Sequence, residues 1–224
     1  MRLPRAGLLA ALFVASPARA EPVLALRLAV APGLGSAAGN LPMSDAVPLQ
    51  FPLQLDALWR EGRLAGGLYG SWGPGQAGGC GGLRCSATVW RVGAEATWAF
   101  DAPGLEPWAG LAVGWEWARA STMDGGTITT TFGGPEVAAQ GGVEWRLLRW
   151  LALGPYALLG VGRYGSYGVE TPAGSASGEI ADRAFHYWLH FGVRGTFTPW
   201  STPAPPSTPS KSPPKPSRPG TLDI

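Results

Sequence analysis

Hydrophobic and polar residues alternate along most of this chain, at the period of two that places neighbouring side chains on opposite faces of a β-strand. Between Thr88 and Phe100 one face is apolar, and the opposite face carries Arg91 and Glu95. Residues 185–197 repeat the pattern. Eight such segments begin near positions 24, 49, 64, 88, 111, 137, 151 and 185. The chain is therefore predicted to be all-β.

The connectors between these segments are alternately long and short. The long ones are 32–47, 73–87, 121–135 and 165–183, and the short ones are 60–63, 101–107 and 148–151. Membrane-spanning barrels have long loops on one side and tight turns on the other. The pattern predicts an eight-stranded antiparallel up-and-down transmembrane β-barrel over residues 21–200, with its long connectors extracellular and its short turns periplasmic.

Two segments fit this pattern less well. Pro52 lies inside the second segment and cannot donate a ladder hydrogen bond, which predicts a bulge or the end of that strand. The seventh segment, 151–164, is apolar or glycine on both faces, so alternation does not fix its register.

The 11 tryptophans provide a second pattern, because most of them fall near segment ends. Tryptophan prefers the interface between lipid and water, where its ring is buried and its N–H is hydrated. We expect two aromatic girdles. The girdle near the long connectors would contain Trp72, Trp90, Trp115, Trp117 and Trp188, and the girdle near the short turns Trp59, Trp98, Trp108, Trp145, Trp150 and Trp200.

The polar faces of the segments contain charges of both signs. An eight-stranded barrel is just wide enough for side chains to fill its interior, and charges buried without partners cost several kcal/mol each. We therefore expect a packed, paired ionic lumen that blocks the passage of solutes. The predicted lumen cluster is Arg27, Asp56, Arg63, Arg91, Glu95, Glu116, Glu144, Arg146, His186, His190 and Arg194.

The first 20 residues have the features of a cleaved secretory signal peptide. Arg2 and Arg5 precede an apolar stretch at 7–14, and Ala18-Arg19-Ala20 is a small-x-small cleavage site. Only 14% of residues are charged and 46% are hydrophobic, whereas soluble domains are about 25% charged. This balance favours an exported barrel in the outer membrane of a Gram-negative bacterium.

Charge also limits the partners that we expect. The signal contains three of the 17 basic residues, so the mature chain has 14 basic against 15 acidic residues. The chain has no basic patch that would predict nucleic-acid binding. Outer-membrane lipid is the expected partner.

Cys80 and Cys85 are the only two cysteines, and both lie in one glycine-rich long connector. In an exported protein such a pair favours a disulfide over a metal site, since no histidine is nearby and two thiolates alone suit zinc poorly. We predict a Cys80–Cys85 disulfide that ties this loop.

Residues 201–224 differ in composition from the rest, because proline occupies eight of these 24 positions. Such a segment cannot bury a core and favours an extended, disordered chain. It would lie on the periplasmic side as a disordered tail. A contact with peptidoglycan or a periplasmic protein is an alternative.

No motif in the sequence predicts a catalytic site, a cofactor or a metal. Three alternatives to a non-enzymatic surface or structural protein stay open. A lipid-modifying enzyme would need His186 to approach Ser166 or Ser177. A small-solute channel would need an open lumen, and a soluble lipocalin-like barrel would have its apolar face inside.

Over residues 21–200 the chain resembles the small eight-stranded outer-membrane barrels, the family that includes the transmembrane domain of outer membrane protein A. The last segment, H-F-G-V-R-G-T-F, is similar to the assembly signal of that family at Gly192 and at the aromatic Phe197. It differs at Gly195, where a hydrophobic residue is usual, and in the tail that follows. The resemblance implies a porin-like barrel inserted by the outer-membrane assembly machinery.

Overall fold

The computed structural model describes residues 20–78, 84–100, 102, 104–123 and 126–199. Almost all of this part is antiparallel β-structure, as predicted. In chain order the elements are β1 (Glu21–Ala38), β2 (Leu41–Pro42), α1 (Met43–Ala46), β3 (Leu49–Gln50), β4 (Leu53–Glu61), β5 (Leu64–Gln76), β6 (Arg84–Ala99), β7 (Glu106–Met123), β8 (Thr127–Leu148), β9 (Leu151–Gly162), β10 (Ser166–Thr171), β11 (Gly174–Glu179) and β12 (His186–Phe197). The predicted signal peptide and tail lie outside the described residues.

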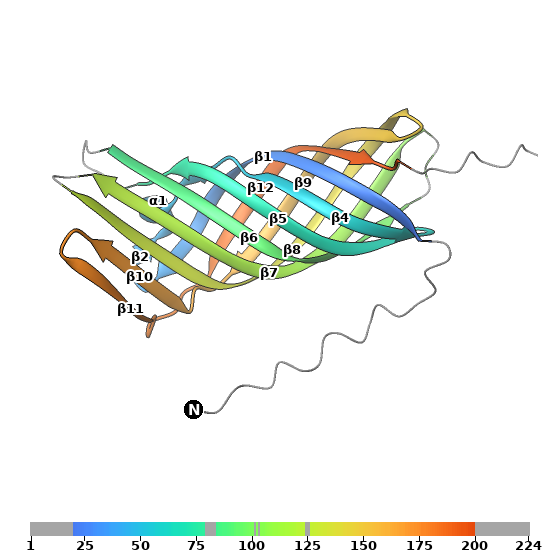
Figure 1. The fold of residues 1–224 in the computed structure, drawn as a ribbon. Coiled ribbons are helices and arrows are strands. Elements are labelled where there is room, and N and C mark those ends of the chain that lie inside the picture. The colour runs from blue at the N-terminus through green and yellow to red at the C-terminus, as the bar shows by residue number, and fades with distance from the viewer. Residues whose placement is uncertain (1–19, 79–83, 101, 103, 124–125, 200–224) are drawn as a thin grey trace, which may run out of the picture.

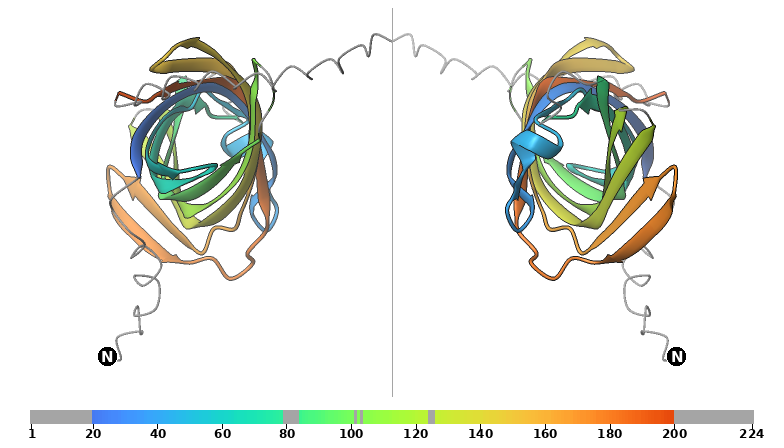
Figure 2. Two further views of the ribbon diagram at one scale, coloured as in Figure 1. Left: turned by 90° about the vertical axis from the view of Figure 1, so that its right-hand side faces the viewer. Right: turned by 90° about the vertical axis from the view of Figure 1, so that its left-hand side faces the viewer.

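The long strands close into a ring. Strands β4 to β9 pair antiparallel in chain order, β9 pairs with β12, β12 pairs with β1, and β1 pairs with β4. The short β3 occupies the same place as β4 between β1 and β5. The end-on views in Figure 2 show the closed ring. The predicted eight-stranded up-and-down barrel is confirmed.

Each barrel strand has one buried and one exposed face. In β4 the side chains alternate strictly between exposed and enclosed over Leu53–Leu58, and β9 does the same over most of its length. The exposed positions are apolar, and Leu111 and Leu68 have 68% and 65% of their surface accessible. The charged positions point inward. This orientation contradicts the lipocalin-like alternative, in which the apolar side chains would fill the interior.

Pro52 interrupts the second barrel strand, as the sequence predicts. The gap between β3 and β4 falls at Phe51 and Pro52. The ladder is maintained around it, because the Phe51 amide donates to the Pro74 carbonyl at 2.8 Å and the Ala29 amide donates to the Pro52 carbonyl at 3.1 Å. The proline therefore breaks the strand without opening the barrel.

The long connectors differ from the prediction, because much of their length is strand. Residues 121–123 belong to β7 and residues 127–135 belong to β8, and the two strands pair as far as Met123 and Thr127. Segment 165–183 contains the β10–β11 hairpin, in which β10 pairs with the outer part of β8. The threonine run at 127–131 is typical of a strand, and in both segments a paired neighbouring strand satisfies the backbone groups. One side of the barrel wall therefore projects beyond the rest (Figure 1).

The first long connector folds back over the mouth of the barrel at this same end. It contains β2 and the single turn of α1, whose Met43 is fully buried. Met43 and Val47 belong to an apolar cluster with Phe132, Tyr164 and Trp188. Figure 2 shows α1 at the wall of the mouth. We call this cluster the apolar plug.

The opposite end of the barrel has the short turns. A two-residue turn joins β4 to β5, with Gly62 at a φ of 60°, and another joins β8 to β9. Glu21 pairs with Arg60 and Leu24 with Phe197, so β1 begins and β12 ends at the short-turn end. No helix among the described residues is long and apolar enough to cross a membrane.

Eight of the predicted girdle tryptophans are exposed at two levels, but two others are buried inside the barrel. Trp72, Trp90, Trp115 and Trp117 are exposed near the plug end, and Trp59, Trp98, Trp145 and Trp150 are exposed near the short-turn end. Trp108 and Trp188 are buried in the lumen instead, because they occupy strand positions whose side chains point into the barrel. Trp200 lies outside the described residues.

Candidate functional site

The lumen contains the densest polar chemistry in the described part of the chain. Ten ionisable side chains are buried there: Arg27, Asp56, Arg91, Glu95, Glu116, Glu136, Glu144, His186, His190 and Arg194. Strand alternation brings them together, since each comes from an inward position and six different strands contribute. They form three layers along the barrel axis.

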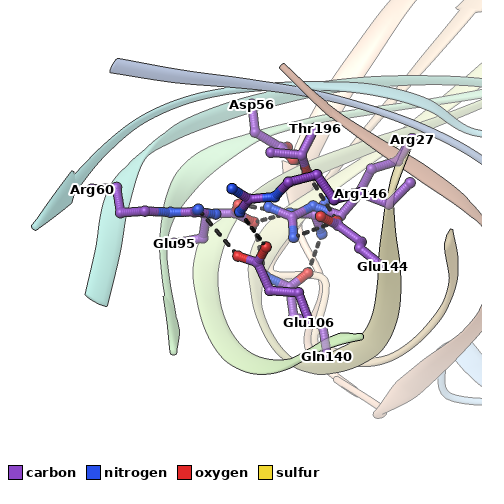
Figure 3. Close-up of polar contacts among 10 residues, drawn as sticks. Arg27, Asp56, Arg60, Glu95, Glu106, Gln140, Glu144, Arg146 and Thr196 are labelled. Carbon is purple, nitrogen blue, oxygen red and sulfur yellow. Dashed lines mark hydrogen bonds and ion pairs between the residues drawn. The ribbon is translucent and has the colours of Figure 1, made fainter. Parts of the chain in front are cut away.

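The middle layer surrounds Arg27 of β1. Its Nε donates to Asp56 Oδ2 at 2.7 Å, and its Nη2 donates to Glu95 Oε1 and Oε2 at 2.6 and 2.8 Å. Its Nη1 donates to Gln140, whose own amide donates to Glu95 Oε2 at 2.9 Å. Gln54 donates to the second oxygen of Asp56 at 2.8 Å. Each polar arm of the guanidinium therefore has an acceptor (Figure 3).

The layer nearest the short turns contains Arg194 and Glu144. Arg194 Nη1 donates to Glu144 Oε1 at 3.0 Å, and the Thr196 hydroxyl donates to the same oxygen at 2.8 Å. The guanidinium carbon of Arg194 lies 4.2 Å from the centroid of the Trp108 ring. This stacking explains why Trp108 is in the lumen: a cation over an indole is stabilised in a desolvated setting.

The third layer lies beneath the apolar plug and surrounds Arg91. Its Nε is 2.7 Å from Glu116 Oε2 and 3.2 Å from Glu136 Oε2, and its guanidinium carbon lies 5.1 Å from the Trp188 ring centroid. Glu116 also accepts a hydrogen bond from the Tyr164 hydroxyl. His186 Nε2 is 3.2 Å from Glu116 Oε1.

Two residues of the predicted lumen cluster lie outside these layers. Arg63 and Arg146 are exposed at the short-turn end, where Arg146 is 2.8 Å from Glu106 and Arg60 is 3.1 Å from the same carboxylate. They line an open cavity of about 680 Å³ with Phe100 and Leu105. Alternation points these side chains toward the lumen, but they lie at its rim, where the described residues do not cover them.

The sequence analysis missed Glu136 and Tyr164. Glu136 directly follows a segment predicted to be a long connector. Since its neighbour Val137 faces outward in the structure, alternation places Glu136 inward. Tyr164 ends the seventh segment, whose faces looked alike. In the structure, residues of even number in β9 face the lumen, and small side chains there make room for large ones on β8 and β12.

The lumen has almost no free space between its layers. A cavity of about 10 Å³ lies between the middle and plug-side layers, lined by Gln54, Tyr69, Glu136 and His190 among others. A volume near 10 to 15 Å³ is about what one water molecule requires. The cavity between these two layers therefore has room for about one water molecule.

The predicted disulfide is described only at one of its two cysteines. Cys85 lies in β6 beside Thr122 of β7, with its Sγ 3.7 Å from the threonine hydroxyl oxygen. Cys80 lies outside the described residues, so the Cys80–Cys85 bond stays a prediction.

Comparisons with known proteins find likeness in structure alone. No protein-family model matches the chain, and no curated protein matches it. A major outer membrane protein from Thermus thermophilus is 12% identical with a TM-score of 0.50, over 78% of this chain and 99% of that one. Neisserial surface protein A is 17% identical with a TM-score of 0.47, over 76% of this chain and 95% of that one. Ail, the attachment invasion locus protein of Yersinia pestis, is 13% identical with a TM-score of 0.40, over 78% and 99%.

At these levels of identity the comparisons show a likeness of fold and carry no function to this chain. The chain has the fold of the small eight-stranded outer-membrane β-barrels.

Proposed function

We propose that this protein is a non-enzymatic outer-membrane barrel of structural or surface-interaction type, exported through a cleaved signal peptide. The observation that carries the proposal is the combination of an apolar exterior with a lumen closed by salt bridges and a plug. A barrel built in this way would anchor the protein in a membrane. The end of its wall that projects beyond the rest would then extend out of the membrane. Recognition would reside in that projecting end, formed by the outer parts of β6 to β8 and the β10–β11 hairpin.

The orientation of the barrel makes the proposal testable on intact cells. The turn between β10 and β11, at Pro172 and Ala173, would lie outside the cell, and the chain end after β12 would lie in the periplasm. An epitope inserted between Pro172 and Ala173 should be labelled on intact cells. An epitope after Ile224 should be labelled only after permeabilisation. The reverse labelling pattern would refute the orientation.

The channel alternative is tested by conductance. Salt bridges and the plug leave the lumen room for about one water, as described above, so the folded protein should show no conductance above background in planar bilayers. Steady single-channel openings would contradict a closed lumen.

The enzyme alternative loses support from the position of His186. Its side chain is buried in the lumen, stacked on Tyr164 with ring centroids 4.1 Å apart. Ser166 lies outside this layer, and its hydroxyl is 3.3 Å from the Gly133 carbonyl oxygen. A nucleophile needs its base within about 2.6–3.2 Å. The absence of lipid hydrolysis by purified, folded protein, unchanged in His186→Ala, is the expected result.

A further inference from the structure

The buried charges of the lumen do not balance. Five buried carboxylates (Asp56, Glu95, Glu116, Glu136 and Glu144) face three buried guanidiniums (Arg27, Arg91 and Arg194) among the described residues. A net charge of −2 in a closed, low-dielectric interior is costly. Two further positive charges would neutralise it.

One excess carboxylate is in the middle layer and one is in the plug-side layer, and the plug-side layer offers a place for a cation. Glu116, Glu136 and His186 each present one ligand atom, and these three atoms lie within 4.8 Å of one another. Ligand atoms bound about 2.0 to 2.2 Å from one tetrahedral metal ion lie about 3.4 Å apart. Movements of up to about 0.7 Å by each ligand atom would bring the three into coordination distance.

His186 is a second, independent sign of a missing partner. Its side chain is 1% exposed and its Nδ1 has no hydrogen-bond partner, while its Nε2 lies 3.2 Å from Glu116 Oε1 without hydrogen-bond geometry. Buried polar groups are almost always hydrogen-bonded, and each exception calls for an explanation. A metal ion on Nε2 would satisfy that nitrogen.

The surrounding backbone keeps this place open. A Cβ at Gly162 would lie 2.6 Å from His186 Cε1, and a Cβ at Gly160 would lie 3.3 Å from Glu136 Cδ. Arg91 Nε contacts the Oε2 atoms of both glutamates and so orients the two carboxylates together. The glycine at 162 leaves the space that the ring of His186 occupies, and the glycine at 160 relieves a close contact with the carboxylate of Glu136.

We propose that Glu116, Glu136 and His186 bind one divalent transition-metal ion of the Zn²⁺ or Mn²⁺ class inside the barrel. One imidazole and two carboxylates are ligands that suit such ions. One ion of charge +2 would also bring the buried lumen charge to zero. The site lies beneath the apolar plug, so the ion would enter while the barrel folds. It would be structural rather than catalytic.

The test uses the mature chain without an affinity tag, refolded from urea and EDTA into detergent with ZnCl₂ or MnCl₂. Metal content is measured after gel filtration. We expect one equivalent of Zn²⁺ or Mn²⁺ per folded barrel in the wild type and below a tenth of that in His186→Asn and Glu136→Gln. His190→Asn is the matched control, because His190 is also buried and inward but lies outside the metal-binding group. It should keep its equivalent.

Two further readouts separate binding from a failure to fold. Each variant is scored for the folded band on an unheated SDS gel, so metal loss counts only in folded protein. Refolding the wild type with Co²⁺ should give visible d–d absorption that His190→Asn retains and His186→Asn lacks. A wild type that holds no metal, and whose unfolding temperature is equal with Zn²⁺ and with EDTA, would overturn the proposal. Protons would then supply the two missing charges.

Discussion

Arg27 of β1 bonds to side chains of β4, β6 and β8, so replacing it would remove contacts between four strands of the barrel. Replacing it with Met leaves Asp56 and Glu95 buried without their cation. We expect Arg27→Met to lower the unfolding free energy by about 3–5 kcal/mol, the usual cost of breaking a buried ion pair from one side. Unfolding by guanidinium chloride, with the barrel folded in lipid vesicles, measures this loss of unfolding free energy.

Arg146→Ala is the matched control, because Arg146 pairs with Glu106 while its side chain is 59% exposed. Exposed pairs contribute about 0–1 kcal/mol, so this change should be nearly silent. An equal loss of unfolding free energy in Arg27→Met and Arg146→Ala would contradict the claim that burial makes the ion pairs of the middle layer stabilising. Replacing Arg27, Asp56 and Glu95 together by apolar residues should recover much of the loss.

Alternation alone predicted most of the individual residues whose side chains point into the lumen. Arg27, Asp56 and Glu95 follow from the period of two, because an inward position in a narrow barrel is a buried one. Alternation could not distinguish a covered inward position from one at the rim, which is why Arg63 and Arg146 differ. It also could not pair the residues, since partners depend on the stagger between strands.

Among the elements, α1 has the clearest role, since its single turn lies at the wall of the mouth and packs Met43 into the apolar plug. Met43 is fully buried there. Met43→Ala should cost about 2–5 kcal/mol, as for other large-to-small changes at packed sites. Ser44→Ala, exposed on the same turn, should have little effect. Parallel unfolding titrations of the two variants check this, and equal stability would show that α1 does not pack as a plug.

The β10–β11 hairpin is expected to be dispensable for folding. All residues of β11 are exposed, and β10 pairs only with the outer part of β8 and with β11 among the described strands. Replacing residues 167–178 by a short Gly-Ser linker should leave the folded SDS-gel band intact. Loss of that band would show that the hairpin is part of the barrel's stability.

Sequence reasoning was weakest for elements of this kind. The Gly- and Thr-rich segments were predicted to be loops, yet 121–123, 127–135 and much of 165–183 are strands. Composition does not distinguish a loop from a hairpin that extends beyond a membrane, because such a hairpin needs no apolar face. The barrel strands were predicted correctly because lipid on one side and a packed lumen on the other impose strict alternation.

For the whole molecule, the exterior determines the environment that the barrel requires. Leu111 lies between the two levels of exposed tryptophans and is 68% exposed. Leu111→Arg should destabilise the barrel in lipid by about 2–4 kcal/mol, the cost of a basic residue at mid-membrane on the lipid face. Leu111→Val should be close to neutral. In a water-soluble barrel the arginine would be harmless, so equal stability of the two variants in vesicles would contradict a lipid-facing exterior.

The most direct measurement is the mobility of the mature protein on SDS gels before and after boiling, once it has been mixed with lipid vesicles. A closed, salt-bridged barrel with an apolar exterior should insert and run as a compact band that shifts on heating. Its solubility should depend on lipid or detergent. A protein that stays soluble in plain buffer, does not insert into vesicles and shows no change of SDS-gel mobility on heating would contradict the central claim of a membrane-spanning barrel.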